Sequence, residues 1–186
     1  MDEIKNIIVL GATGSIGTQT LDVVRQHPDK LKVVGLVAYS SKEKLEASAR
    51  EFGVSNTILV NEENSEAEAT AKVSNLIEND DVDIVVNAMS GAAGLTASYT
   101  TLKKNKRLAL ANKESLVVGG DLLIPMAKNN LLPIDSEHGA IFQCLIGEKK
   151  SDINKIHLTA SGGPFYGKTK EELKDVTSKE ALKHPT

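Results

Sequence analysis

The chain has 186 residues, with 22 Lys and Arg against 25 Asp and Glu, a formal net charge of −3, 40% hydrophobic residues and no Trp. So small a charge, with only 3% aromatic residues, argues against a nucleic-acid surface, and the single Cys144 excludes an intramolecular disulfide framework. No apolar stretch is long enough to span a bilayer, and the N-terminus resembles neither a signal peptide nor a transit peptide, so we expect a cytoplasmic protein.

Apolar runs alternate with segments of helical spacing along most of the chain. Pro28 ends the first expected helix. Gly53 follows the second expected helix, a position where glycine is common. In chain order, we expect a strand over 4–10, a helix over 15–26, a strand over 31–38, a helix over 41–52, a strand over 57–60, a helix over 62–78, a strand over 83–87, a helix over 92–104, a strand over 107–111, a helix over 115–129, a strand over 131–134 and a helix over 136–146. Such alternation predicts an α/β fold, a Rossmann-like doubly wound sheet that is mostly parallel.

The pattern changes after about residue 135. Residues 153–160 alternate in polarity, which predicts a strand with an accessible face and the start of an α+β domain. We therefore expect one domain over 1–132 and the first part of another over 133–186.

The first strand runs into glycines spaced G-x-x-G-x-x-G, at the turn that leads into a helix. Glycine allows a close approach to a pyrophosphate, and the new helix offers free N–H groups and a positive dipole end. The alternative is an ordinary tight turn. The position of the motif favours a dinucleotide site whose contacts are Gly11, Thr13, Gly14, Ser15, Ile16 and Gly17.

The end of the second strand bears on the choice of dinucleotide. NAD-specific folds usually carry an acid there, for the ribose 2′-hydroxyl, but residues 38–42 contain none. Hydroxyls and a cation suit a 2′-phosphate, so we predict NADP, with Ser40 and Ser41 as contacts and Lys42 as a weaker candidate. Glu43 argues against this choice, and the two serines could instead cap the next helix.

Two further strand ends point to the same crevice, since ligands of doubly wound folds bind beyond the carboxyl ends of the strands. Small residues over 88–94 would let a ring or ribose pass close to the backbone, or would pack a helix tightly on the sheet. Asn112, Lys113 and Glu114 follow the fifth strand, where a cofactor would meet a substrate.

Asp135 and Glu137 stand two residues apart after an apolar run, with Ser136 between them. In an extended backbone their side chains would point to the same side. Converging carboxylates repel unless a cation lies between them, and a hard divalent ion such as Mg²⁺ or Mn²⁺ prefers oxygen ligands. The alternative is a pair of solvated acids at the end of a strand.

Four segments, in this order, resemble the 1-deoxy-D-xylulose 5-phosphate reductoisomerase family: 11–17 (GATGSIG), 111–117 (ANKESLV), 133–138 (PIDSEH) and 158–165 (LTASGGPF). The resemblance covers essentially the whole chain. It implies an enzyme that uses NADPH and Mg²⁺ or Mn²⁺, with Co²⁺ as a third candidate. The reaction is the rearrangement and reduction of 1-deoxy-D-xylulose 5-phosphate to 2-C-methyl-D-erythritol 4-phosphate, in non-mevalonate isoprenoid biosynthesis.

The resemblance also implies roles for individual residues. Asp135 and Glu137 would be catalytic metal ligands, and Lys113 would place positive charge beside a developing oxyanion. Asn112 and Glu114 would line the cofactor side, and His138 would be structural or supporting. The residues implied in binding the phosphorylated sugar are Lys113, Ser136, Ser161 and His184.

The resemblance also implies a function for each of the two domains. Residues 1–132 would be the NADP-binding Rossmann domain, and 133–186 the N-terminal part of the catalytic and connective domain. The family carries further elements, among them a third metal carboxylate, that the sequence lacks. We therefore expect a truncated form that binds cofactor weakly and turns over little, from a protein that forms homodimers at full length.

The sequence also departs from the family pattern at two places. Ser90 stands where a small residue, usually glycine, is found, and residues 39–41 replace a common Gly-basic-Asn pattern at the 2′-phosphate.

Two other functions remain open. A two-domain NADP reductase of the semialdehyde dehydrogenase type would need a nucleophilic cysteine, and Cys144 lies in an apolar helix where we expect it to be core. A nucleotide-binding or oligomerisation module without catalysis is the other alternative.

Overall fold

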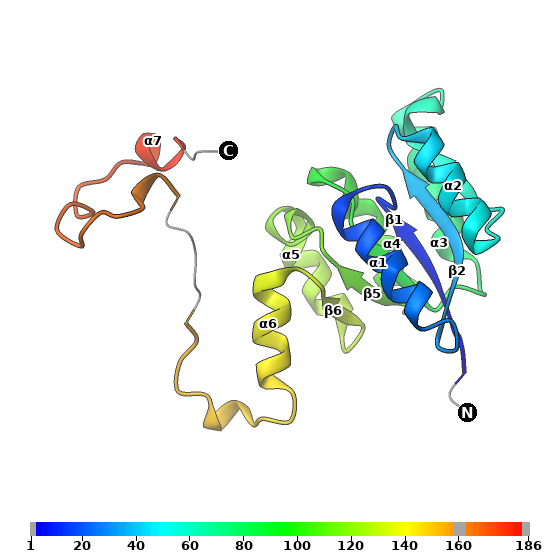
Figure 1. The fold of residues 1–186 in the computed structure, drawn as a ribbon. Coiled ribbons are helices and arrows are strands. Elements are labelled where there is room, and N and C mark those ends of the chain that lie inside the picture. The colour runs from blue at the N-terminus through cyan, green and yellow to red at the C-terminus, as the bar shows by residue number, and fades with distance from the viewer. Residues whose placement is uncertain (1–2, 158–162, 184–186) are drawn as a thin grey trace. The chain divides into compact units, whose positions relative to one another are not determined.

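The computed structural model describes residues 3–157 and 163–183, and it divides into two compact units, Met1–Gly139 and Ala140–Thr186 (Figure 1). Ser161 and His184, both expected to bind substrate, lie outside the described residues. No helix among the described residues is long and apolar enough to cross a membrane.

The first unit is built on one parallel sheet in the order β3-β2-β1-β4-β5-β6. Its strands are β1 (Lys5–Leu10), β2 (Leu31–Ala38), β3 (Thr57–Leu59), β4 (Ile84–Asn87), β5 (Arg107–Leu110) and β6 (Leu131–Pro133). The predicted α/β fold with a mostly parallel sheet is confirmed. Because both faces of such a sheet are covered by helices, its central strands are apolar on both sides.

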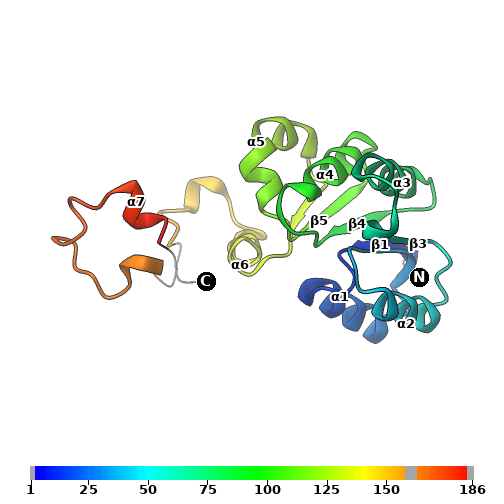
Figure 2. The same ribbon diagram turned by 90° about the horizontal axis from the view of Figure 1, so that it is seen from above.

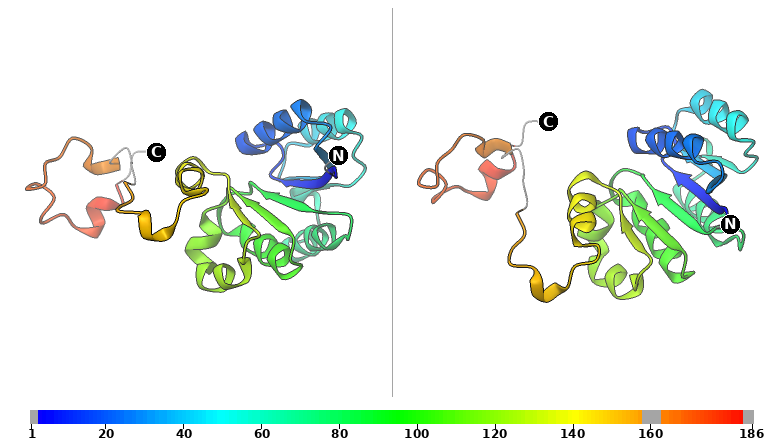
Figure 3. Two further views of the ribbon diagram at one scale, coloured as in Figure 1. Left: turned by 90° about the horizontal axis from the view of Figure 1, so that it is seen from below. Right: turned by 60° about the horizontal axis from the view of Figure 1, so that its bottom comes forward.

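Helices connect the strands and form a layer on each face of the sheet. Figures 2 and 3 show α1 and α2 on one face and α3, α4 and α5 on the other. The helices of this unit are α1 (Ser15–Gln26), α2 (Lys42–Phe52), α3 (Glu66–Glu78), α4 (Gly94–Lys103), α5 (Glu114–Ala127) and the start of α6 (Ser136–Leu145), with short 3₁₀ turns η1 (Val60–Glu62) and η2 (Gly91–Ala93).

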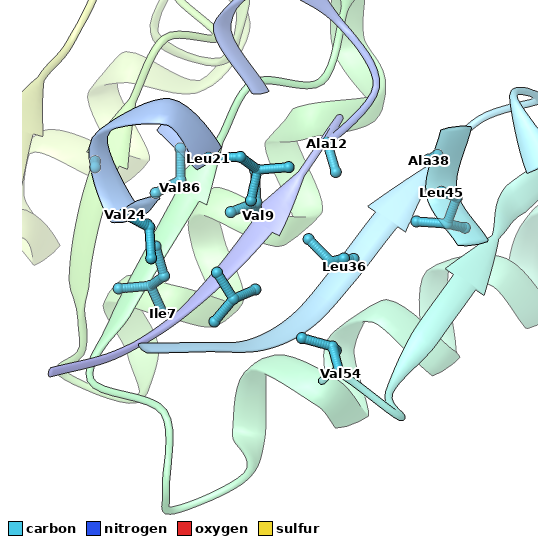
Figure 4. Close-up of a cluster of buried hydrophobic side chains, with 12 residues drawn as sticks. Ile7, Val9, Ala12, Leu21, Val24, Leu36, Ala38, Leu45, Val54 and Val86 are labelled. Atoms are coloured by element: carbon cyan, nitrogen blue, oxygen red, sulfur yellow. The ribbon is translucent and has the colours of Figure 1, made fainter. Parts of the chain in front are cut away.

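Alternate residues of β1 point to opposite helix layers, as the pleat of a strand requires. Ile7 and Val9 pack in a cluster with Leu21 and Val24 of α1 (Figure 4). Ile8 and Leu10 belong to a second cluster, together with side chains of α3 and α4. The central strand is thus buried on both sides, and the glycine turn that follows Leu10 is held on a rigid base.

The strand order positions the candidate site. The chain moves outward from β1 to β3, and then returns to start again beside β1 with β4. In doubly wound folds, ligands usually bind beyond the carboxyl ends of the strands at such a reversal, which here lies between β1 and β4.

The second unit has little regular structure over its described residues. Besides the rest of α6, it contains η3 (Lys150–Asp152), η4 (Gly163–Phe165) and α7 (Ser178–Ala181), whose capping box pairs Thr177 with Glu180. The strand expected over 153–160 is wrong for residues 153–157, which are irregular. A strand needs a neighbour for its N–H and C=O groups, and the described part of this unit contains no other strand.

Candidate functional site

The turn from β1 to α1 needs glycine at Gly11 and Gly17. Gly11 has φ +80°, and a Cβ there would lie 2.4 Å from the Ala88 carbonyl oxygen. A Cβ on Gly17 would lie 2.2 Å from the Gly11 carbonyl oxygen. The glycines therefore let the turn fold on itself and pack directly against the segment that follows β4.

The N-terminus of α1 is open to an anion. Gly14 is the N-cap residue, with no side-chain capping bond, and the first turn of the helix holds no acid. Thr13 is half-exposed and Ser15 is exposed, so their polar groups are accessible. Free N–H groups and the positive end of the helix dipole suit a pyrophosphate.

The hydroxyls after β2 are also accessible. Ser41 occupies the N-cap position of α2, yet its side chain makes no capping hydrogen bond, which weakens the capping alternative. Lys42 Nζ lies 3.1 Å from Glu62 Oε1, so its charge is partly matched within the protein. Ser40 and Ser41 are thus better placed than Lys42 to bind a phosphate.

A cavity of about 520 Å³ adjoins this edge of the sheet. It is lined by residues that follow β2, β3 and β4 and by the facing sides of α3 and α4, with Tyr39, Asn61, Glu63, Ser65, Thr70, Met89, Ala92, Ala93 and Thr96 among them. Its volume suits a small molecule or part of a cofactor. The sequence did not predict that residues before and within α3 would line a cavity. The one sequence signal for it was that a third strand, β3, ends at the same edge of the sheet.

The segment after β5 carries three expected site residues in different environments. Asn112 is 1% exposed, and its amide is bonded within the protein, whereas Lys113 and Glu114 are exposed. Glu114 Oε2 lies 3.3 Å from Asn112 Nδ2. Lys113 Nζ lies 3.9 Å from Glu137 Oε2, which brings the segments after β5 and β6 together.

The backbone around the two acids differs from the expected geometry. Asp135 precedes α6, and Glu137 lies in its first turn, so the extended backbone that was expected to align them is absent. Asp135 Oδ1 accepts the His138 backbone N–H at 3.1 Å, which is an N-cap type of contact. The helix begins here because this bond satisfies an N–H group that the first turn leaves free.

Both acids are held in the charged form. Partial burial raises the pKa of Asp135, but hydrogen bonds from the His138 backbone and ring, and the charge of Lys113, outweigh burial and keep the pKa below its usual value. The hydroxyl of Ser136, and then a backbone N–H and the charge of Lys113, lower the pKa of Glu137. Two ionised carboxylates, of which Asp135 is partly buried and Glu137 is exposed, are suitable ligands for a hard divalent cation.

Over the described residues, no group of three or more His, Cys, Asp or Glu side chains is arranged to hold a metal ion. Asp135 and Glu137 can therefore contribute only part of a ligand set, and the remaining positions would be taken by water or substrate oxygens.

The expectation that Cys144 is a core residue is wrong, because its side chain is exposed. An accessible thiol does not by itself make a nucleophile.

Comparisons with known proteins agree with the motifs. A family model described as 1-deoxy-D-xylulose 5-phosphate reductoisomerase matches residues 7–120, and one described as the C-terminal domain of that enzyme matches residues 131–186. A relative of that name from Clostridium tetani is 47% identical over 199 aligned positions, which cover 97% of this chain and 52% of the relative.

Solved structures give the same result. The reductoisomerase from Zymomonas mobilis in complex with NADPH aligns with a TM-score of 0.79 and 34% identity, over 98% of this chain and 52% of that one. A structure of DOX-P reductoisomerase with NADPH, fosmidomycin and magnesium aligns with a TM-score of 0.72 and 36% identity, over 98% and 51%. The chain thus spans about half the length of the curated relatives it matches.

Proposed function

Since the chain belongs to the 1-deoxy-D-xylulose 5-phosphate reductoisomerase family, we propose that it carries the NADPH site and two metal ligands of that enzyme. The reaction is the NADPH-dependent conversion of 1-deoxy-D-xylulose 5-phosphate to 2-C-methyl-D-erythritol 4-phosphate. The observation that carries the proposal is the approach of Lys113 to Glu137 at 3.9 Å, at the sheet edge that also holds the glycine turn.

The cofactor would be held by the protein's own backbone and hydroxyls. The N-terminus of α1 and the residues Thr13 to Gly17 would bind the pyrophosphate, because they offer N–H groups and a positive dipole. Ser40 and Ser41 would bind the 2′-phosphate. The exposed carboxylate of Glu114 would face the cofactor from the segment after β5. Bound there, NADPH supplies the hydride for the reduction.

Asp135 and Glu137 would hold Mg²⁺, and Mn²⁺ or Co²⁺ have the same preference for these oxygens. A cation bound there polarises a substrate carbonyl. Lys113 would stabilise negative charge that develops on a substrate oxygen, since its Nζ already lies beside one of the two acids. Ser136 would bond substrate oxygens. Ser161 and His184 remain proposed substrate contacts, on the family resemblance alone.

We also propose a phosphorylated sugar as the substrate, a homodimer and a cytoplasmic location. The family supports the first two. One cysteine in 186 residues supports a reducing compartment.

The first test measures NADPH and NADH binding to the 186-residue chain by fluorescence titration. We expect NADPH to bind at least about tenfold more tightly, since charge-assisted hydrogen bonds to a phosphate favour it. Equal binding of the two, or a preference for NADH, would contradict the cofactor assignment.

The second test measures catalysis in a chimera that continues residues 1–186 into the remaining half of the Clostridium tetani relative. With the sugar phosphate and Mg²⁺, we expect NADPH oxidation, and we expect its loss in the same chimera with Asp135→Asn. A chimera that binds NADPH but shows no turnover would favour a nucleotide-binding module without catalysis.

A further inference from the structure

Four buried polar side chains form a continuous network between the segments that follow β4 and β5. They are 1% exposed or less, and we call them the amide–hydroxyl network: Asn87, Ser98, Asn112 and Ser115. Buried polar groups cost free energy unless they are hydrogen-bonded, so a network of this kind holds one particular arrangement of its members.

Asn112 is at the centre of the network. Its Nδ2 donates to the carbonyl oxygens of Met89 and Gly91, both at 2.8 Å, and lies 3.3 Å from Glu114 Oε2. Its Oδ1 accepts the backbone N–H of Ser115 at 3.1 Å and also the Ser115 hydroxyl. A side-chain amide has two N–H donors and one oxygen acceptor, so this one is fully used inside the protein.

Asn87 extends the network to α4. Its Nδ2 donates to the Gly94 carbonyl oxygen at 2.8 Å and to Ser98 Oγ at 2.9 Å. Ser98 Oγ in turn lies 3.5 Å from Ser115 Oγ, which closes the connection to α5. A Cβ on Gly94 would lie 2.6 Å from Asn112 Cγ, so the amide fits only against a glycine.

The network joins two parts of the candidate site. Met89, whose carbonyl oxygen accepts from Asn112, lines the 520 Å³ cavity, and so do Ala92 and Ala93 in the same segment. Lys113 directly follows Asn112 in the chain. The position of the cavity wall and the position of Lys113 are therefore set by the same side chain.

We infer that Asn112 is a positioning residue, whose side-chain amide holds the cavity wall at residues 89–93 and the Lys113 segment in fixed relative positions. Asn87, Ser98 and Ser115 are the other members of the amide–hydroxyl network. The inference rests on the proposed function in that NADPH binds at this edge of the sheet, and it adds that part of the cofactor occupies the cavity. A purely structural network would contribute to stability alone.

The test compares network variants with a matched variant in the 186-residue chain. Asn112→Ala removes the centre, and Ser98→Ala is a milder change on α4. The control is Thr101→Val, because Thr101 is also fully buried on α4 but its hydroxyl donates to Ala97 within the helix. The measurements are the urea midpoint, the Kd for NADPH, and amide exchange of residues 89–94 and 113–116 by NMR.

We expect Asn112→Ala to weaken NADPH binding about tenfold, because it removes two buried hydrogen bonds to the cavity wall. Amide exchange should accelerate in both segments, while exchange in β1 changes only as far as global stability does. Ser98→Ala should act in the same direction and more weakly. Thr101→Val should lower stability and leave the Kd within about twofold.

Wild-type NADPH affinity in Asn112→Ala would overturn the inference, as would an affinity loss in Thr101→Val in proportion to its loss of stability. If Asn112→Ala does not fold, Ser98→Ala decides between the same outcomes. If the wild-type chain binds no NADPH, the proposed function fails. In that case amide exchange still tests whether Asn112 couples residues 89–94 to residues 113–116. Faster exchange in only one of these two segments of Asn112→Ala would refute the coupling.

Discussion

His138 contacts one oxygen of Asp135 twice: its ring Nδ1 lies 2.7 Å from Oδ1, and its backbone N lies 3.1 Å from the same atom. Within residues 3–157 and 163–183, every hydrogen bond and ion pair of this carboxylate uses Oδ1. These contacts with His138 orient the carboxylate through Oδ1 before any cation arrives.

This relationship predicts how Mn²⁺ binding depends on pH. The pKa of Asp135 is lowered in the fold, so its contribution to stability is present above the unfolded value of about 3.9 and is lost as the pH falls through the folded pKa. Mn²⁺ affinity should therefore fall only as the pH drops through the folded pKa of Asp135, which lies below the unfolded value. His138→Ala should move the fall to higher pH, because the pKa of Asp135 rises. Electron paramagnetic resonance of free Mn²⁺ measures the affinity, and identical pH profiles would contradict the prediction.

The two acids should both be needed for metal binding. Asp135→Asn and Glu137→Gln should each weaken Mn²⁺ binding about tenfold or more, since a hard cation loses one of its few charged ligands. Asp121→Asn is the control, because Asp121 is an exposed acid on α5 outside the site. Calorimetric titration in the 186-residue chain measures the affinities. An equal effect of all three changes would reduce the assignment to nonspecific attraction by negative charge.

Gly11 should be far less tolerant of a side chain than Gly53. Both have positive φ, +80° and +64°, but a Cβ on Gly11 would meet the Ala88 backbone, whereas Gly53 has nothing within 4 Å. Gly53→Ala should lower the free energy of unfolding by about 1 kcal/mol, which is the cost of the backbone conformation alone. Gly11→Ala adds the clash and should cost about 3 kcal/mol. Urea unfolding measures both, and equal costs would mean that the approach to Ala88 is unimportant.

Ser40 and Ser41 should decide the preference for NADPH. The double change to alanine should weaken NADPH binding about tenfold and leave NADH binding unchanged, because only NADPH carries the 2′-phosphate. Stability should hardly change, since Ser41 makes no side-chain capping bond. Ser55→Ala, an exposed serine at the opposite edge of the sheet, is the control. A parallel loss of NADPH and NADH affinity would place these hydroxyls outside the phosphate site.

Local sequence predicted much of the first unit because its signals are short-range. The helix over 15–26 and the strand over 31–38 match α1 and β2 residue for residue. In both cases the spacing of apolar residues agrees with burial, and Gly14 and Pro28 flank the helix. The predicted helix over 62–78 instead begins at Glu66, as α3, because Ser65 accepts the Glu68 N–H and caps the helix there.

The predictions were weaker where structure depends on distant partners. Alternating polarity over 153–160 did not produce a strand in residues 153–157, since a strand also requires a neighbour. The expected alignment of Asp135 with Glu137 assumed an extended backbone, whereas the first turn of α6 includes Glu137.

The sequence by itself determined the alternation of strands and helices, the glycine turn and the identity of the acids, because each depends on residues near one another in the chain. Only the tertiary structure decided that Lys113 meets Glu137, that a cavity opens beside α3 and α4, and that Asn112 is buried against Gly94. Those relationships join residues that the strand order brings together, and local propensity carries no information about that order.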